Sequence, residues 1–112
     1  MKFWGKVRRY IQRGRKLGFP TANVNLNKKI PEGIYISKTK IGESIYPSLT
    51  FIGQARIAEI YILDFSKNIY DQWITVELIK KIRNNQKFGS VDDLIKQMKQ
   101  DEQVARQFFT LD

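Results

Sequence analysis

The chain of 112 residues contains no cysteine and no histidine. Without cysteine it has no disulfide and no thiolate nucleophile, which fits an expected cytoplasmic location. Without histidine it lacks imidazole acid–base catalysis, the Ser-His-Asp triad and the usual zinc ligands. A catalytic base must therefore be a carboxylate or an unusual lysine or tyrosine. A bound metal would be a hard, oxygen-ligated ion such as Mg²⁺.

Long hydrophobic runs are also missing. No stretch approaches the roughly 18 apolar residues of a membrane-spanning helix, and no signal-peptide pattern opens the chain, so we expect no membrane association. The length suits a single domain over residues 1–112, and a hydrophobic content of 42% is typical of a folded protein. We expect this domain to be a monomer.

The chain does carry an excess of positive charge, with a formal net charge of +9. Residues 1–16 contain cations but no acid, and Trp4 and Tyr10 lie among them. Such a segment could bind single-stranded nucleic acid, steer a nucleotide triphosphate or only keep the domain soluble. Composition leaves these three interpretations open. The cations are Lys2, Lys6, Arg8, Arg9, Arg13, Arg15 and Lys16.

Alternating hydrophobic residues predict about six short strands followed by one helix. The run at 56–65 is apolar enough for a strand buried on both faces, and Pro47 favours an edge position or a bulge. A period near 3.6 after Ser90 predicts a helix capped by that serine, with its stripe of apolar residues in the core. The pattern implies an antiparallel barrel or sandwich closed by the helix. The expected strands are 2–7, 21–26, 34–40, 45–52, 56–65 and 73–83.

Residues 14–23 have the composition of a phosphate-binding loop. Glycines allow positive φ and close approach to a ligand, and two cations lie between them. Thr21 and Asn23 are two residues apart, so in an extended segment their side chains point to the same face, where they could meet a metal or a sugar. An ordinary surface loop is the alternative, since a short glycine-rich loop is a weak signal. The flexible cationic part comprises Gly14, Arg15, Lys16 and Gly18.

Glu59 and Arg83 are the other candidate site residues. Glu59 interrupts the apolar run at 56–65, and burial of an unpaired carboxylate disfavours its charged form. It is either a general base with a raised pKa or a strand residue that faces water or an arginine. Arg83 ends the last predicted strand, where it could reach a ligand over the barrel mouth or be a surface cation.

Taken in order, these motifs resemble the riboflavin kinase family. Residues 5–7 are similar to its G-x-V opening, and residues 14–23 to its G-R-x-L-G-F-P-T-A-N signature. The resemblance covers nearly the whole chain. Tyr10, Tyr61 and Asp71 replace a glycine, a histidine and a glycine of the family, and its N-I-G-x-x-P-T-F segment is matched only at 49–53. Further similar segments are 31–35 (P-x-G-V-Y), 59–65 (E-x-H-L-L-D-F), 69–70 (L-Y-G), and 78–83 with 87–94 (F-x-x-x-L-R…K-F-x-S-x-x-x-L).

The resemblance implies a mainly β fold, a six-stranded antiparallel Greek-key barrel with a C-terminal helix. It implies an enzyme that transfers the γ-phosphate of ATP to the ribityl 5′-hydroxyl of riboflavin, giving FMN. By position, Thr21 and Asn23 would hold Mg²⁺ and the nucleotide phosphates. Glu59 would take the proton from the attacking hydroxyl, and Arg83 would lie near the flavin. The loop over the phosphates would comprise Gly14, Arg15, Lys16 and Gly18.

Other functions remain as alternatives to the kinase. One is a flavin- or nucleotide-binding module with little catalysis, suggested by the replacements at Tyr10 and in the segment before Glu59. The least favoured is a small basic barrel that binds single-stranded nucleic acid through residues 2–16. FAD synthesis is not expected, because no part of the sequence is long enough for an adenylyltransferase module.

Overall fold

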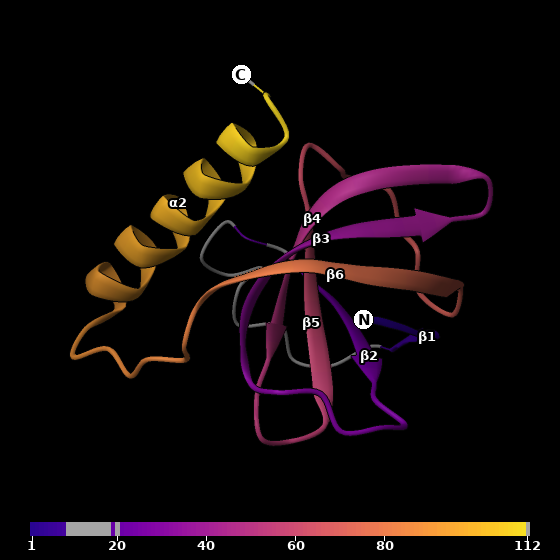
Figure 1. The fold of residues 1–112 in the computed structure, drawn as a ribbon, viewed down its shortest axis with the longest axis horizontal. Coiled ribbons are helices and arrows are strands. Elements are labelled where there is room, and N and C mark those ends of the chain that lie inside the picture. Colours follow the sequence, from indigo (N-terminus) through magenta and orange to yellow (C-terminus); the bar gives the residue numbers. More distant parts are fainter. Residues whose placement is uncertain (9–18, 20, 112) are drawn as a thin grey trace.

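The structure, a computed structural model, describes residues 1–8, 19 and 21–111. The described chain folds into a closed antiparallel barrel with the strand order β1-β2-β5-β4-β3-β6, followed by a helix (Figure 1). This confirms the mainly β fold, with a six-stranded barrel and a C-terminal helix, and excludes the sandwich. The elements are β1 (Lys2–Arg8), β2 (Ala22–Asn25), β3 (Gly33–Ile41), β4 (Ser44–Ile52), β5 (Ile57–Ile62), β6 (Trp73–Arg83) and α2 (Val91–Phe108).

Successive side chains of a strand point to opposite faces of the sheet, so every second residue of each strand points into the barrel. Apolar side chains fill most of this interior, because burying them is the main favourable term in folding. They come from strands at both ends of the chain, so the barrel closes only when β1 and β6 meet. The largest of these fully buried residues include Phe3, Val7, Val24, Ile60, Ile74 and Val76.

The interior also holds a group of fully buried hydroxyl side chains, here called the hydroxyl chain: Thr39, Ser48, Ser37 and Thr50. Ser37 Oγ lies 2.7 Å from Ser48 Oγ and 2.8 Å from Thr50 Oγ1. Thr39 Oγ1 lies 2.8 Å from Ser48 Oγ. Because each member has a partner, the cost of removing these groups from water is offset. The hydroxyl chain therefore links β3 to β4 inside the barrel.

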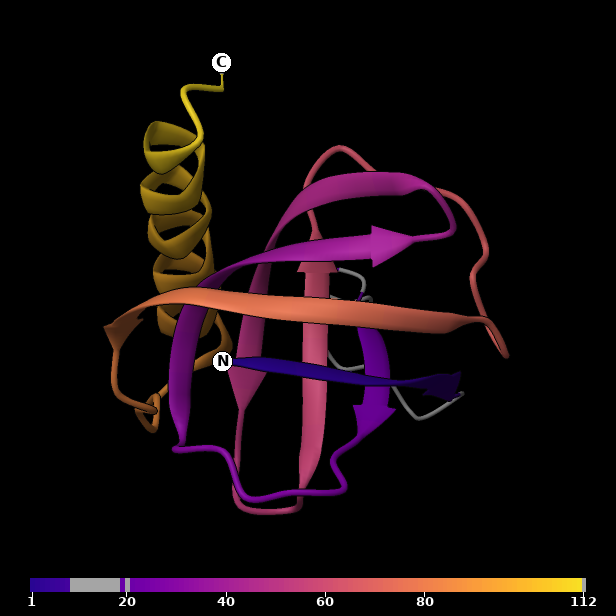
Figure 2. The ribbon, with the colours of Figure 1, turned by 45° about the vertical axis from the view of Figure 1, so that its right-hand side comes forward.

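Helix α2 packs on the outer surface of the barrel, beside β3 and β4 (Figure 2). Ala105 and Phe109 at its C-terminal end contact an outer hydrophobic cluster that includes Ile34, Ile36 and Leu49. The predicted N-cap is confirmed, since the Asp93 backbone N–H donates to Ser90 Oγ at 3.1 Å. Within the described residues, the structure contains no helix that is long and apolar enough to cross a membrane.

The predicted burial of the fifth strand on both faces is wrong. Strand β5 is shorter than 56–65, and its residues alternate between full and partial burial. Ala58 and Ile60 face the interior and are fully buried, whereas Glu59 and Tyr61 face outward and are half-buried. The outer face of β5 is therefore open in part, and Glu59 lies on that open face.

The edge position expected from Pro47 needs a similar correction. Strand β4 is not an edge strand, because the barrel is closed and β4 pairs with both β3 and β5. Its ladder with β5 begins only at Ser48, so Pro47 lies just beyond that ladder. Proline has no backbone N–H to donate, and at this position the pairing with β5 requires no such hydrogen bond.

Candidate active site

A row of cross-strand neighbours, here called the site row, runs across the outer surface of the barrel. Asn23 of β2 pairs with Glu59 of β5, which pairs with Phe51 of β4. Phe51 pairs with Ile34 of β3, and Ile34 pairs with Arg83 at the end of β6. Directly opposed residues on neighbouring strands share a face of the sheet. The register thus brings the predicted residues Asn23, Glu59 and Arg83 onto one surface, although they are far apart in the sequence.

A cavity of about 290 Å³ lies over the site row, between the barrel and α2, and is here called the helix cavity. Glu59, Phe51 and Arg83 line its barrel side, and Leu94 and Met98 line its helix side. A concave, mostly apolar space with a few polar groups suits a flat organic ligand. The remaining lining residues are Thr21, Ile34, Ile52, Gly53, Asn85, Gln86 and Phe88.

A second cavity, of about 360 Å³, adjoins the segment between β5 and β6 and is here called the loop cavity. Thr21 lines both cavities and is the one described residue that they share. Two ligands that occupied the two cavities would therefore approach each other at Thr21, beside the site row. The loop cavity is lined by Thr21, Ala22, Ile60, Ile62, Phe65, Ser66, Lys67, Asn68, Ile69 and Tyr70.

Two buried oxygen atoms at this junction have no hydrogen-bond partner among the described residues, Thr21 Oγ1 and Asn23 Oδ1. The two side chains are only 7% and 2% exposed. A buried polar atom without a partner costs about 1–3 kcal/mol, so two of them side by side favour a site that binds a ligand. Hydroxyl and amide oxygens fit a hard cation such as Mg²⁺, which takes most of its other ligands from water and phosphate.

No group of three or more acidic, histidine or cysteine side chains gathers anywhere in the described part of the chain. A Mg²⁺ ion held by few protein oxygens and by substrate phosphates needs no such group. Thr21 and Asn23 are thus brought together as the sequence indicates, and their role as metal ligands stays a prediction.

Glu59 is the carboxylate of the site row, and it opens into the helix cavity. Burial raises its pKa above the usual value of a glutamate, because the charged form loses contact with water. No ion pair of the described residues involves it. A carboxylate whose ionisation is made costly in this way is a better proton acceptor than a solvated one.

Arg83 is neither a free surface cation nor a side chain that reaches over an open mouth. Its Nε and Nη2 donate to Asp101 Oδ1 and Oδ2 of α2 at 2.8 Å and 2.7 Å. Its Nη1 donates to the Asn84 carbonyl at 3.1 Å. Arg83 is therefore a lining residue of the helix cavity whose guanidinium is held in place by Asp101 and the Asn84 carbonyl. Its role toward a flavin stays a prediction.

Sequence reasoning missed three residues of this site. Leu94 and Met98 belong to the helical stripe that was predicted to be core, but they line the helix cavity. Asp101 is buried on the same stripe, three residues after Met98 and four before Ala105. An acid at an apolar position of an amphipathic helix is a detectable signal, because such a group needs a buried partner.

The residues of this chain that replace family residues have different structural roles. Asp71 has φ of 66°, a left-handed conformation that glycine adopts freely and that aspartate tolerates better than most residues. Tyr61 donates to Glu102 Oε1 at 3.2 Å, and burial, with the nearby Glu102 charge and hydrogen bond, raises its pKa to about 12. Neither residue lines the helix cavity or the loop cavity. The other predicted residues, Tyr10 and the loop residues Gly14, Arg15, Lys16 and Gly18, lie outside the described residues.

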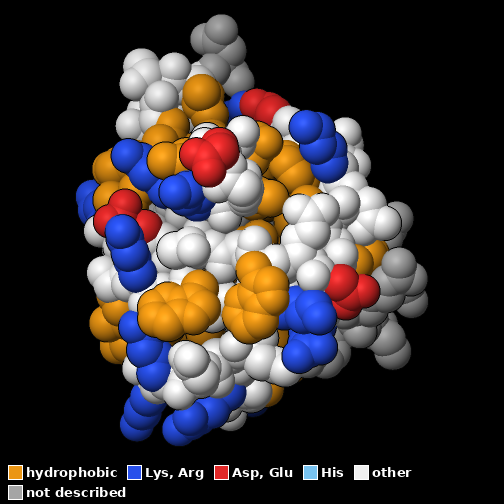
Figure 3. Space-filling view, turned by 90° about the vertical axis from the view of Figure 1, so that its right-hand side faces the viewer, with side chains coloured by type: hydrophobic (Ala, Val, Ile, Leu, Met, Phe, Trp, Pro, Cys, Tyr) orange, Lys and Arg blue, Asp and Glu red, His pale blue; other side chains and the backbone are white. Residues whose placement is uncertain are grey.

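No residue of β1 lines either cavity, although Arg8 at its end pairs with Asn23 of the site row. Trp4 and Trp73 are 57% and 65% exposed, on neighbouring strands β1 and β6, and Lys6 pairs with Trp73. Figure 3, which views the side that is on the right in Figure 1, shows hydrophobic side chains at the surface with lysine and arginine around them. Trp4 and Lys6, two of the residues that suggested nucleic-acid binding, are therefore not part of either cavity lining.

Comparison with known proteins agrees with the geometry. The family described as riboflavin kinase matches residues 1–109. A bifunctional riboflavin kinase/FMN adenylyltransferase from Haemophilus influenzae is 36% identical, over 96% of this chain and 38% of that protein. The chain thus spans a little over a third of the length of that relative.

Solved structures show the same barrel and helix. A protein from Streptococcus pneumoniae, described as a macrolide-efflux protein, matches with a TM-score of 0.87 and 33% identity, over 94% of this chain and 38% of that one. A riboflavin kinase from Trypanosoma brucei matches with a TM-score of 0.72 at 24% identity, over 97% and 76% of the two chains. The second likeness is one of fold.

Proposed function

Because the chain belongs to the riboflavin kinase family, we propose that it transfers the γ-phosphate of ATP to the ribityl 5′-hydroxyl of riboflavin, giving FMN and ADP. One observation carries the proposal. The two cavities share Thr21 in their linings, and Asn23, whose side chain like that of Thr21 has an unpartnered oxygen among the described residues, pairs across the strands with Glu59. A two-substrate transfer needs this arrangement, in which the ligands are separate except at their reacting ends.

The linings suggest which substrate enters which cavity. The helix cavity has Phe51, Leu94 and Met98 in its walls, which suits the flat, largely apolar isoalloxazine ring of riboflavin. The loop cavity has Phe65 and Tyr70 with Lys67 beside them, which suits an adenine base and its ribose. The ribityl chain and the triphosphate would then extend toward each other and meet near Thr21.

Glu59 would act as the general base. Its carboxylate takes the proton of the ribityl 5′-hydroxyl as that oxygen forms a bond to the γ-phosphorus. The bond between the γ-phosphorus and the bridging oxygen breaks, and ADP leaves with that electron pair. Phosphoryl transfer depends mostly on positioning and charge stabilisation. When bound, Mg²⁺ offsets the negative charge of the phosphates, and Thr21 and Asn23 are the residues that would hold it.

The proposal is tested by incubating the purified chain with riboflavin, ATP and Mg²⁺ and separating the flavins by chromatography. We expect FMN and ADP to form in equal amounts. Quenching of riboflavin fluorescence on binding, measured without ATP, separates binding from turnover. Binding without FMN would support the alternative of a flavin-binding module and overturn the kinase.

A further inference from the structure

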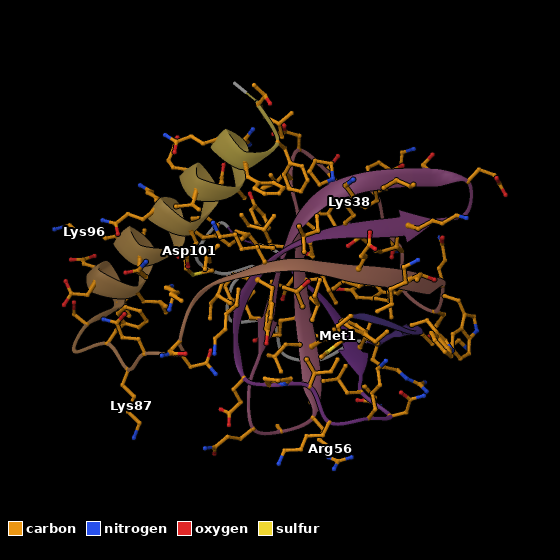
Figure 4. The ribbon with its side chains drawn as sticks, viewed as in Figure 1. Met1, Lys38, Arg56, Lys87, Lys96 and Asp101 are labelled. Carbon is orange, nitrogen blue, oxygen red and sulfur yellow. The ribbon has the colours of Figure 1, made fainter. Side chains whose placement is uncertain are left out.

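Asp101 is the most deeply buried acidic group of the described chain, with 2% of its side chain exposed. It lies on the side of α2 that is turned toward the barrel, whereas Lys96 on the same helix points away (Figure 4). Both carboxylate oxygens accept hydrogen bonds from Arg83, and Gln97 Nε2 donates to Oδ1 at 3.1 Å. A charge that is buried this deeply requires a partner of opposite charge that also satisfies its hydrogen bonds.

Arg83, the partner of Asp101, lines the helix cavity, so the ion pair affects that cavity. Two parallel hydrogen bonds fix the plane of the Arg83 guanidinium, which a single bond would leave free to turn. The carboxylate also offsets the positive charge of the guanidinium. A lining residue of the cavity therefore carries a fixed, charge-compensated group, which suits a flat ring without net charge better than it suits a phosphate.

We propose that Asp101 is a positioning and specificity-determining residue. By holding and neutralising Arg83, it makes the helix cavity selective for the flavin ring and keeps the phosphates of the nucleotide out of it. This inference rests on the proposed function, in which the helix cavity takes the flavin. Asp101 itself does not line the cavity and acts through Arg83.

The neighbouring residue Glu102 offers a matched control. It is also an acid of α2 that pairs with an arginine, since Arg106 Nε donates to Glu102 Oε2 at 2.9 Å. Glu102 also accepts a hydrogen bond from the hydroxyl of Tyr61. None of these three residues lines either cavity. Loss of the Glu102 charge thus disturbs the packing of the helix without touching Arg83.

The test compares Asp101→Asn with Glu102→Gln in the full chain. For Asp101→Asn we expect the Kd of riboflavin, measured by fluorescence quenching, to rise about tenfold, as for the loss of a charged hydrogen bond. The KM of ATP should stay unchanged, because the loop cavity is untouched. Inorganic triphosphate should also begin to compete with riboflavin, since an unpaired Arg83 attracts it. Glu102→Gln should show none of these changes.

The inference is overturned if the Kd of riboflavin stays the same in Asp101→Asn, if triphosphate does not compete, or if Glu102→Gln behaves alike. If Asp101→Asn does not fold, Arg83→Lys replaces it, because an ammonium cannot hold two carboxylate oxygens in a fixed plane. A folded Arg83→Lys chain with the wild-type Kd would also overturn it. Failure of the wild-type chain to bind riboflavin would instead overturn the proposed function.

Discussion

Two groups of buried polar side chains in this molecule differ in whether their oxygen atoms have hydrogen-bond partners. The hydroxyl chain inside the barrel is fully buried, and every hydroxyl in it has a partner within 2.8 Å. On the outer surface, Thr21 and Asn23 are buried almost as deeply, yet each has an oxygen without a partner among the described residues. Beside them, burial raises the pKa of Glu59.

This difference separates polar groups that serve the fold from polar groups that serve a ligand. A satisfied buried hydroxyl stabilises the native state or is neutral, whereas an unsatisfied one destabilises it. Selection retains a destabilising arrangement where activity requires it. We therefore expect substitutions in the two groups to have opposite effects on stability and on activity.

The largest effect is expected from Glu59→Gln. Without a carboxylate to accept the proton of the attacking hydroxyl, kcat should fall about 10²- to 10⁴-fold, the usual contribution of a general base. Chromatographic measurement of FMN gives the rate, and fluorescence quenching should show riboflavin binding retained. Glu77→Gln, at an exposed position of β6, is the matched control and should keep the wild-type rate. A fully active Glu59→Gln chain would remove Glu59 from this role.

A pair of isosteric substitutions compares the two groups directly. Thr21→Val removes an unpartnered hydroxyl, so we expect FMN formation to fall while the free energy of unfolding stays the same or rises. Thr50→Val removes a partner of Ser37 inside the barrel, so the free energy of unfolding should fall by about 1 kcal/mol with activity retained. Denaturant unfolding and the FMN assay measure the two quantities on both variants.

The Mg²⁺ dependence sharpens the result for Thr21. Loss of a group that only orients a metal ligand costs about 10- to 100-fold in metal affinity. Because Thr21 would itself be a ligand, we expect Thr21→Val to raise the half-saturating Mg²⁺ concentration by at least this much. The dependence should be unchanged in Thr50→Val. Equal losses of activity in the two variants, or a loss of stability in Thr21→Val alone, would contradict the division between the groups.

Much of this arrangement was predictable from local patterns. Period-two alternation predicted the strands, and Ser90 with the apolar stripe predicted the helix, because both signals lie within a short window. The site row was not predictable in this way. The pairing of Asn23 with Glu59, and of Ile34 with Arg83, depends on long-range register. Local signals singled out Thr21, Asn23, Glu59 and Arg83 one by one, but only resemblance to a family joined them in a single site.

The helix cavity escaped prediction for a different reason. Leu94, Met98 and Ala105 share one helical stripe, but Ala105 packs on the barrel while the other two line the helix cavity. An apolar stripe indicates only that this face of the helix is shielded from water. A bound ligand can shield it as well as a neighbouring strand can. The distinction appears only when the angle between helix and barrel is known.

The smallest expected effect concerns the pH dependence of stability at Glu59. Because burial raises its pKa in the folded state, the native protein binds this proton more tightly than the unfolded chain does. The wild type therefore loses stability as the pH rises from the unfolded pKa, about 4.3, through the raised folded pKa. Glutamine never ionises, so Glu59→Gln should melt higher than the wild type near neutral pH, by on the order of 2 °C.

The sign of the difference in Tm between Glu59→Gln and the wild type shows whether the Glu59 carboxylate destabilises the fold. The gain in Tm should shrink toward zero as the pH falls below the unfolded pKa, because both side chains are then neutral. Contributions of other groups, such as Asp64, whose pKa is lowered by its hydrogen bond from Arg106, are common to both proteins and cancel. A Glu59→Gln chain that melts lower than the wild type near neutral pH would show that the carboxylate stabilises the fold. Glu59 would then belong with the satisfied polar groups, and its proposed role as a base would lose its physical support.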